Sequence, residues 1–63
     1  MTFRIMDPKT EGNIYGDISE KNAVWNNVEK HEKPLSEMII GETQMCTFRA
    51  SGVKCEYRVI RLA

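Results

Sequence analysis

The sequence predicts an α+β fold, in which residues 1–63 form one small domain with a helix packed on a mostly antiparallel sheet. Three observations support this prediction. Residues 2–6 alternate as a strand does, residues 19–33 show the start and stop signals of a helix, and residues 43–62 form two alternating runs around a turn. The expected order is β-α-β-β, ending in a C-terminal β-hairpin. It becomes β-β-α-β-β if residues 13–15 form a short returning strand.

The N-terminal strand is predicted from a period of two. Phe3 and Ile5 fall on one side of this segment and Thr2 and Arg4 on the other, until Pro8 interrupts the pattern. We therefore expect Phe3 and Ile5 to face the core.

Tyr15 lies between Gly12 and Gly16 in the segment that follows. Functional loops often combine glycines with an exposed aromatic side chain, so Tyr15 is a candidate contact for a partner. The alternative is that its ring covers the edge of the core. The two glycines do not form a phosphate-binding loop, because the following Lys-Ser/Thr and the preceding buried strand are missing.

Residues 19–33 are expected to form the single helix. Ser19 can cap its first turn, and Val24 and Val28 lie one turn apart on a narrow apolar stripe. Pro34 ends the helix, because the residue before a proline avoids the α region. We expect the stripe to dock on the hairpin and the charged side chains to face solvent.

The linker over residues 34–41 holds more apolar side chains than a loop needs. One interpretation places Leu35, Met38 and Ile40 at the end of the core. The alternative is an exposed patch of Met38, Ile39 and Ile40 that binds a partner or a second copy of the chain.

The C-terminal hairpin is predicted to close on Ser51-Gly52, with Ala50 facing Val53. A two-residue loop defines the pairing of both strands. The further pairs are Phe48 with Cys55, Cys46 with Tyr57 and Gln44 with Val59. The inward face then carries seven mostly apolar side chains: Cys46, Phe48, Ala50, Val53, Cys55, Tyr57 and Val59.

The last strand changes its apolar parity after Val59, since the next apolar residues are Ile60 and Leu62. A bulge or an exit from the sheet near Val59 would explain this change. Alternatively, both faces of the sheet are covered there, one by the helix and the other by a dimer mate or by Thr43 and Met45.

The outward face of the hairpin is polar, and on it Arg49 is expected to oppose Lys54. Like charges in this position repel unless a carboxylate such as Glu56 or a bound anion relieves them. Arg49, Lys54, Arg58 and Arg61 are therefore candidate contacts for phosphate or for an acidic protein surface. The lack of paired exposed aromatic side chains argues against base stacking.

The sequence predicts no catalytic, metal or cofactor site. The only cysteines, Cys46 and Cys55, are expected to be reduced and packed in the core, diagonal to each other. His31 is expected on the exposed end of the helix, away from both thiols. Two cysteines and one histidine, with no Cys-x-x-Cys pair, do not complete a zinc site.

The composition is that of a globular domain without a bulk electrostatic partner. Nine Lys and Arg balance nine Asp and Glu, whereas a non-specific nucleic-acid binder shows a basic excess. No apolar run has the length of a signal peptide or membrane span, so a cytoplasmic location is expected. The initial methionine suggests a complete small gene product, for which a phage or mobile element is a plausible source.

By elimination, the sequence predicts a small non-enzymatic protein that binds another protein as an accessory, regulatory or inhibitory factor. The expected contacts are Tyr15, Met38 and Ile39 together with the basic residues of the hairpin, and a homodimer is compatible with the spare apolar residues. The alternative is a nucleic-acid-binding module that uses Arg49, Lys54 and Arg58.

Overall fold

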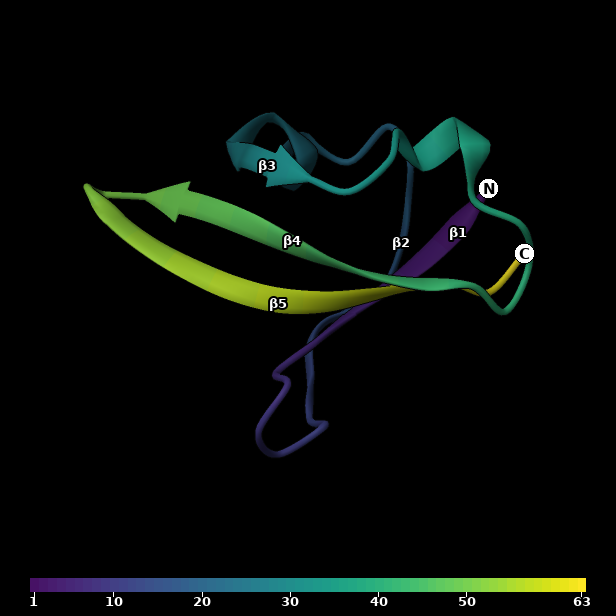
Figure 1. The fold of residues 1–63 in the computed structure, drawn as a ribbon, viewed down its shortest axis with the longest axis horizontal. Coiled ribbons are helices and arrows are strands. Elements are labelled where there is room, and N and C mark those ends of the chain that lie inside the picture. Colours follow the sequence, from purple (N-terminus) through teal and green to yellow (C-terminus); the bar gives the residue numbers. More distant parts are fainter.

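The computed structural model describes residues 1–63 as one five-stranded antiparallel sheet with the strand order β2-β1-β5-β4-β3 (Figure 1). Two short 3₁₀ turns are its only helical elements, and neither could cross a membrane. The elements are β1 (Thr2–Met6), β2 (Asn13–Ser19), η1 (Ala23–Asn27), β3 (Val28–His31), η2 (Leu35–Glu37), β4 (Thr43–Ala50) and β5 (Val53–Arg61).

The prediction of an α+β fold is therefore wrong, and the error lies in the helix expected over residues 19–33. Ser19 ends β2, a single 3₁₀ turn follows, and Val28 begins β3. The cap is Asn22, whose side-chain oxygen accepts a hydrogen bond from the Val24 N–H at 2.9 Å.

The physical reason is that this segment is a weak helix former with a better alternative. Asn22, Asn26 and Asn27 compete for backbone hydrogen bonds, and the β-branched Val24 and Val28 lose side-chain freedom in a helix. A lone helix of this length is marginal in water. Pairing Val28 with Phe48 instead supplies β4 with a neighbour on its free edge.

The N-terminal half forms a two-stranded unit, because the returning strand is longer than expected and pairs with β1. Phe3 opposes Ile18 and Arg4 opposes Asp17, but the register then shifts, so that three residues of β2 stand against one residue of β1 before Met6 meets Asn13. Gly16 takes a φ of 77° within this bulge. The bulge turns the segment around Tyr15 away from regular pairing.

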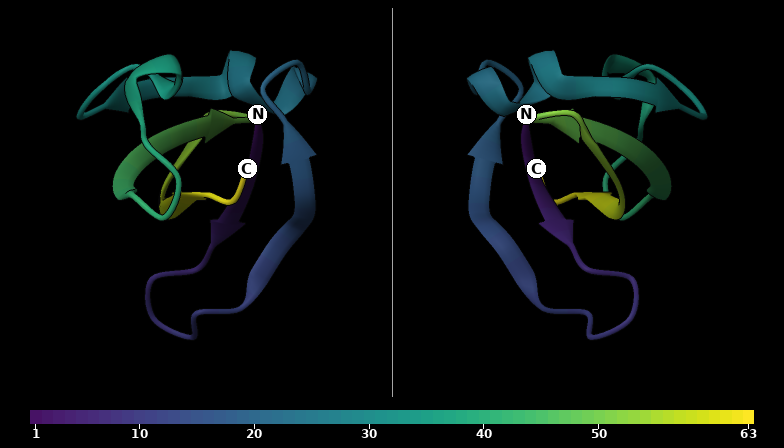
Figure 2. Two further views of the ribbon diagram at one scale, coloured as in Figure 1. Left: turned by 90° about the vertical axis from the view of Figure 1, so that its right-hand side faces the viewer. Right: turned by 90° about the vertical axis from the view of Figure 1, so that its left-hand side faces the viewer.

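The sheet curls around its core, and η1 joins its two edge strands directly in sequence (Figure 2). Trp25 fills the corner between these edges. Its ring packs edge-on against Phe3, with the ring centroids 5.5 Å apart, and is tilted against Phe48, with the centroids 5.9 Å apart. Its indole N–H donates to the Ser19 carbonyl at 2.8 Å. The inward face of the hairpin is thus covered by a 3₁₀ turn and the curled sheet, not by a helix.

The hairpin itself is confirmed pair by pair. Ala50 faces Val53, and the pairs continue without a shift to Gln44 with Val59 and Thr43 with Ile60. Ser51 and Gly52 have φ values of 52° and 77°, which a type I′ turn requires.

The core is small, and its buried apolar side chains come from β1, β4, β5 and the linker before β4. The expected burial of Phe3 and Ile5 is confirmed. The core side chains are Phe3, Ile5, Met38, Cys46, Phe48 and Val59, with Ile18, Val24, Trp25, Val28, Leu35 and Tyr57 packed around them. Ala50 and Val53 lie beyond it, exposed at the tip of the hairpin.

The bulge or exit expected near Val59 is wrong. β5 runs unbroken to Arg61, because it is the central strand and pairs with β4 on one side and β1 on the other. Ile60 lies between Arg4 and Thr43 on the outer face and is half-buried. The change in parity therefore marks a strand with apolar side chains on both faces.

Candidate functional site

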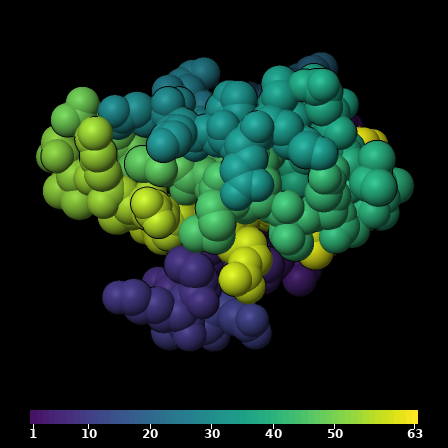
Figure 3. All heavy atoms as spheres, viewed as in Figure 1, coloured from purple at the N-terminus to yellow at the C-terminus, as the bar shows by residue number.

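The linker before β4 displays the two most exposed large apolar side chains of the molecule. Ile39 is 71% exposed and Ile40 is 66% exposed, whereas Met38 is only 1% exposed and belongs to the core. The patch expected over Met38, Ile39 and Ile40 is thus reduced to the two isoleucines, and Ile40 does not plug the core. In the space-filling view, the segment after η2 projects at one end of the molecule (Figure 3).

These isoleucines stand on a well-defined turn. The Glu42 N–H donates to the Ile39 carbonyl at 3.0 Å, and Gly41 takes a φ of 88°, as the third position of a type II turn requires. The Gly41 N–H also donates to the Arg61 carbonyl at 2.8 Å. We refer to residues 39–42 as the isoleucine turn.

Side chains tie the isoleucine turn to the sheet from both sides. The Glu42 carboxylate accepts the Ile39 N–H at 3.0 Å and pairs with the Lys33 ammonium at 2.5 Å. The Arg61 guanidinium donates to the Met38 carbonyl at 2.6 Å. The Lys33 hydrogen bond and then the Ile39 N–H hold the pKa of Glu42 below its usual value. The turn is therefore ordered although its apolar side chains face outward.

The basic side chains predicted as contacts are each partnered within the chain. Arg49 and Lys54 oppose each other as expected, but Glu29 of β3 lies 3.8 Å from the first and 3.1 Å from the second. Arg58 pairs with Glu11 at 3.6 Å. The expected partner Glu56 is replaced by Glu29, because β3 takes the place of the predicted helix.

Arg61, the fourth basic candidate, lies apart from the other three at the isoleucine turn. Its guanidinium is occupied by two backbone carbonyls, those of Met38 and Ala63. The four cations thus do not form one continuous patch, which counts against binding a phosphate backbone.

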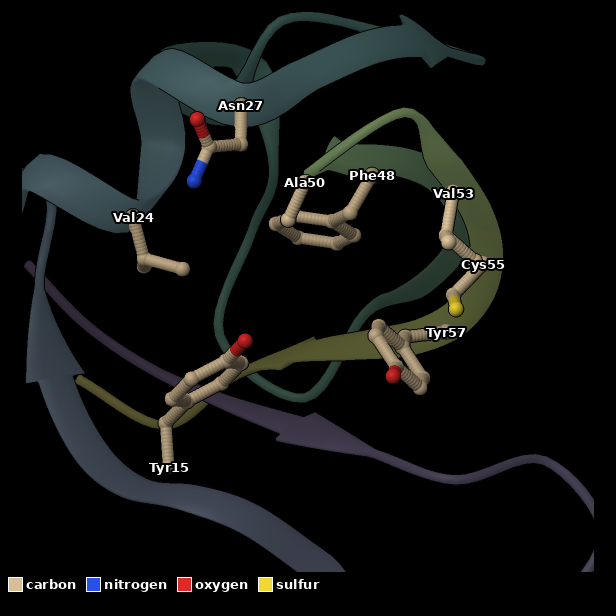
Figure 4. Close-up of a pocket in the computed structure, with 8 residues that line it drawn as sticks. All are labelled: Tyr15, Val24, Asn27, Phe48, Ala50, Val53, Cys55 and Tyr57. Carbon is tan, nitrogen blue, oxygen red and sulfur yellow. The ribbon is translucent and has the colours of Figure 1, made fainter.

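Tyr15 lies at the other end of the core, where it borders a small apolar pocket (Figure 4). The pocket measures about 60 Å³, far below the roughly 300–1,000 Å³ of small-molecule sites. Val24 and Asn27 of η1 line one side and the hairpin lines another. The hairpin contributes Phe48, Ala50, Val53, Cys55 and Tyr57. This pocket has the size of a single apolar side chain.

The side chains most often used in reactive sites are one histidine and two cysteines in this chain. His31 lies opposite Cys46 in the β3–β4 register, yet Cys46 is buried and no hydrogen bond joins the two side chains. Burial raises the pKa of the Cys46 thiol to about 11. Cys55 is half-buried, both cysteines are free, and no three His, Cys, Asp or Glu side chains converge as metal ligands would.

Two important residues escaped the sequence interpretation. In the sequence, Glu42 is simply a charged residue that follows a glycine, and Glu29 falls on the solvent face of the predicted helix. Only the strand assignment of residues 28–31 would have placed Glu29 beside the hairpin. The type II turn signal at Gly41 could have identified Glu42.

Comparison of the chain with protein-family models, with curated proteins and with solved structures finds no match.

Proposed function

We propose that this chain is a small non-enzymatic protein that binds another protein as an accessory, regulatory or inhibitory factor, with the isoleucine turn as its main contact. The observation that carries the proposal is that the two most exposed isoleucines stand on a turn held by both backbone and side-chain hydrogen bonds.

The energetics of binding support this proposal. An exposed apolar side chain gains nothing from its position in the isolated monomer, whereas a preorganised one loses little conformational entropy when a partner covers it. Two adjacent isoleucines can bury enough apolar surface for a binding hot spot. Scattered single apolar residues would need no such explanation.

The test is affinity capture from the cells that produce the protein, comparing the wild type with the double variant Ile39→Ser/Ile40→Ser. Each captured protein is then purified and its Kd measured by titration calorimetry. We expect the double variant to bind at least tenfold more weakly, or ~1.4 kcal/mol. Serine is chosen because a new carboxylate beside Glu42 would disturb the turn itself.

Val53→Ser is the matched control, since Val53 is also apolar and 60% exposed but lies beside the pocket at the other end of the core. We expect it to bind like the wild type. Loss of binding in Val53→Ser alone would move the contact to the pocket around Tyr15. Binding unaffected by Ile39→Ser/Ile40→Ser would contradict the proposed contact.

A further inference from the structure

One ionisable residue of the isoleucine turn links three parts of the chain through its side chain and its backbone. Glu42 bonds to the Ile39 N–H within the turn and to Lys33, which follows β3, and its backbone carbonyl accepts the Arg61 N–H of β5 at 3.1 Å. Its side chain is partly buried, at 27% exposure, while that of Lys33 is 42% exposed. The other hydrogen bonds of residues 39–42 join backbone groups.

We propose that Glu42 is an electrostatic latch: its ionised carboxylate keeps the isoleucine turn in the conformation that displays Ile39 and Ile40, and protonation at acid pH releases the turn. This inference rests on the proposed function for its biological consequence, but the latch itself can be tested without a partner.

The reason is a difference between the two protonation states. As a carboxylate, Glu42 accepts from the Ile39 N–H and from the Lys33 ammonium at the same time, both as charge-assisted hydrogen bonds. Once protonated, it loses its attraction to Lys33, and its acceptor strength toward Ile39 falls. The turn then keeps three backbone bonds, Glu42 to Ile39, Gly41 to Arg61 and Arg61 to Glu42, together with the Arg61 side-chain contact to the Met38 carbonyl.

The charged groups around Glu42 favour its ionised form at neutral pH. Lys33 lies against it, and Arg61 lies on the adjacent strand. Glu32 and Glu37 also act on Lys33 and raise its pKa, after the larger effect of Glu42 itself. Because the pKa of Glu42 is lowered in the folded chain, the latch is closed above the usual glutamate range and opens as the pH falls through the lowered value.

The experiment is ¹⁵N NMR of the full chain between pH 7 and pH 3. In the wild type, the Ile39 amide proton should shift upfield with a midpoint below the usual glutamate pKa of about 4.3. Backbone order parameters at Ile40 and Gly41 should fall from about 0.85 to below about 0.6 over the same range. Glu42→Gln should show the low order parameters already at pH 7 and lose the acid titration of the Ile39 amide.

Glu37→Gln is the matched control, because Glu37 is an exposed acidic neighbour without an ion pair. It should leave both readouts like those of the wild type. Lys33→Gln should raise the midpoint of the Ile39 titration. The amides of Phe48 and Cys55 in the hairpin report whether each variant is folded.

The outcomes separate the latch from the proposed function. If Glu42→Gln keeps the wild-type order parameters at pH 7, the latch is overturned, whatever Ile39→Ser/Ile40→Ser does to binding. If Glu42→Gln loosens the turn while Ile39→Ser/Ile40→Ser still binds normally, the latch is supported and the proposed contact is wrong.

Discussion

Gln44 occupies a core position, 4% exposed, that would suit an apolar residue. Its side chain instead forms hydrogen bonds to the backbone of a neighbouring segment. Its amide oxygen accepts the N–H groups of Glu32 and Lys33 at 2.9 and 3.1 Å, and its amide nitrogen donates to the Lys33 carbonyl at 2.9 Å. The same nitrogen lies 3.1 Å from the Met38 sulfur. One side chain therefore fixes the segment between β3 and η2, where Lys33 meets Glu42.

Gln44→Leu should destabilise the fold by about 1–3 kcal/mol, because it leaves backbone groups of residues 32–33 without their partners. Urea unfolding followed by circular dichroism measures this change. Thr47→Ala, on the outer face of the same strand, is the control and should change stability by less than about 0.5 kcal/mol. Equal stabilities for the two variants would show that water replaces the hydrogen bonds of Gln44 with no loss of folding free energy.

At the scale of elements, a strand or turn could be predicted where residues close in sequence determine it. The hairpin could be predicted to the residue, because Ser51-Gly52 determines its pairs. The strand over 2–6 was predicted from its alternation. The helix predicted over residues 19–33 was wrong, because the amphipathic stripe of this segment is compatible with more than one structure. The strand that pairs with it, β4, lies elsewhere in the chain.

The candidate site shows the same limit. The exposure of Ile39 was one of two alternatives for the linker, and nothing local distinguished Met38, which is buried, from its two neighbours. The pairing of Arg49 with Lys54 was correctly predicted, whereas their relief by Glu29 required knowledge of β3.

The hairpin loop yields a prediction of its own. Gly52→Ala should lower the free energy of unfolding by about 1–2 kcal/mol, because an L residue at a φ of 77° clashes with its own backbone. No neighbouring atom lies within 4 Å of the new Cβ, so packing does not contribute. Ser51→Asn should keep or raise stability, since asparagine favours this turn. Thermal unfolding compares the two, and a stable Gly52→Ala would contradict the type I′ assignment.

At the scale of the whole molecule, the stability of the fold should fall at acid pH. Arg4 holds the pKa of Asp17 below its usual value, as Lys33 does for Glu42. Each pair therefore contributes stability above the usual carboxylate range that is lost as the pH falls through the lowered values. We expect a constant Tm from pH 7 to about pH 5 and a decline below about pH 4.

Calorimetry across this pH range checks the expectation, and salt gives a second test. Because the Arg4–Asp17 pair is solvent-exposed and the Lys33–Glu42 pair is only partly buried, 1 M NaCl should weaken both at neutral pH and flatten the acid dependence. Asp17→Asn should show a shallower decline than the wild type. A Tm that stays level down to pH 3 would mean that these ion pairs contribute nothing to folding.

The central place of β5 has a consequence for how the protein is made. β1 is synthesised before β5, yet Phe3 pairs with Arg61, so the middle of the sheet stays empty until β5 has left the ribosome. Until then β1 and β4 each lack a neighbour, and their open edges can recruit other chains. Such long-range closure is slow, in the millisecond-to-second range for β folds of this kind. The arrival of β5 thus sets when the open edges of β1 and β4 are protected from aggregation.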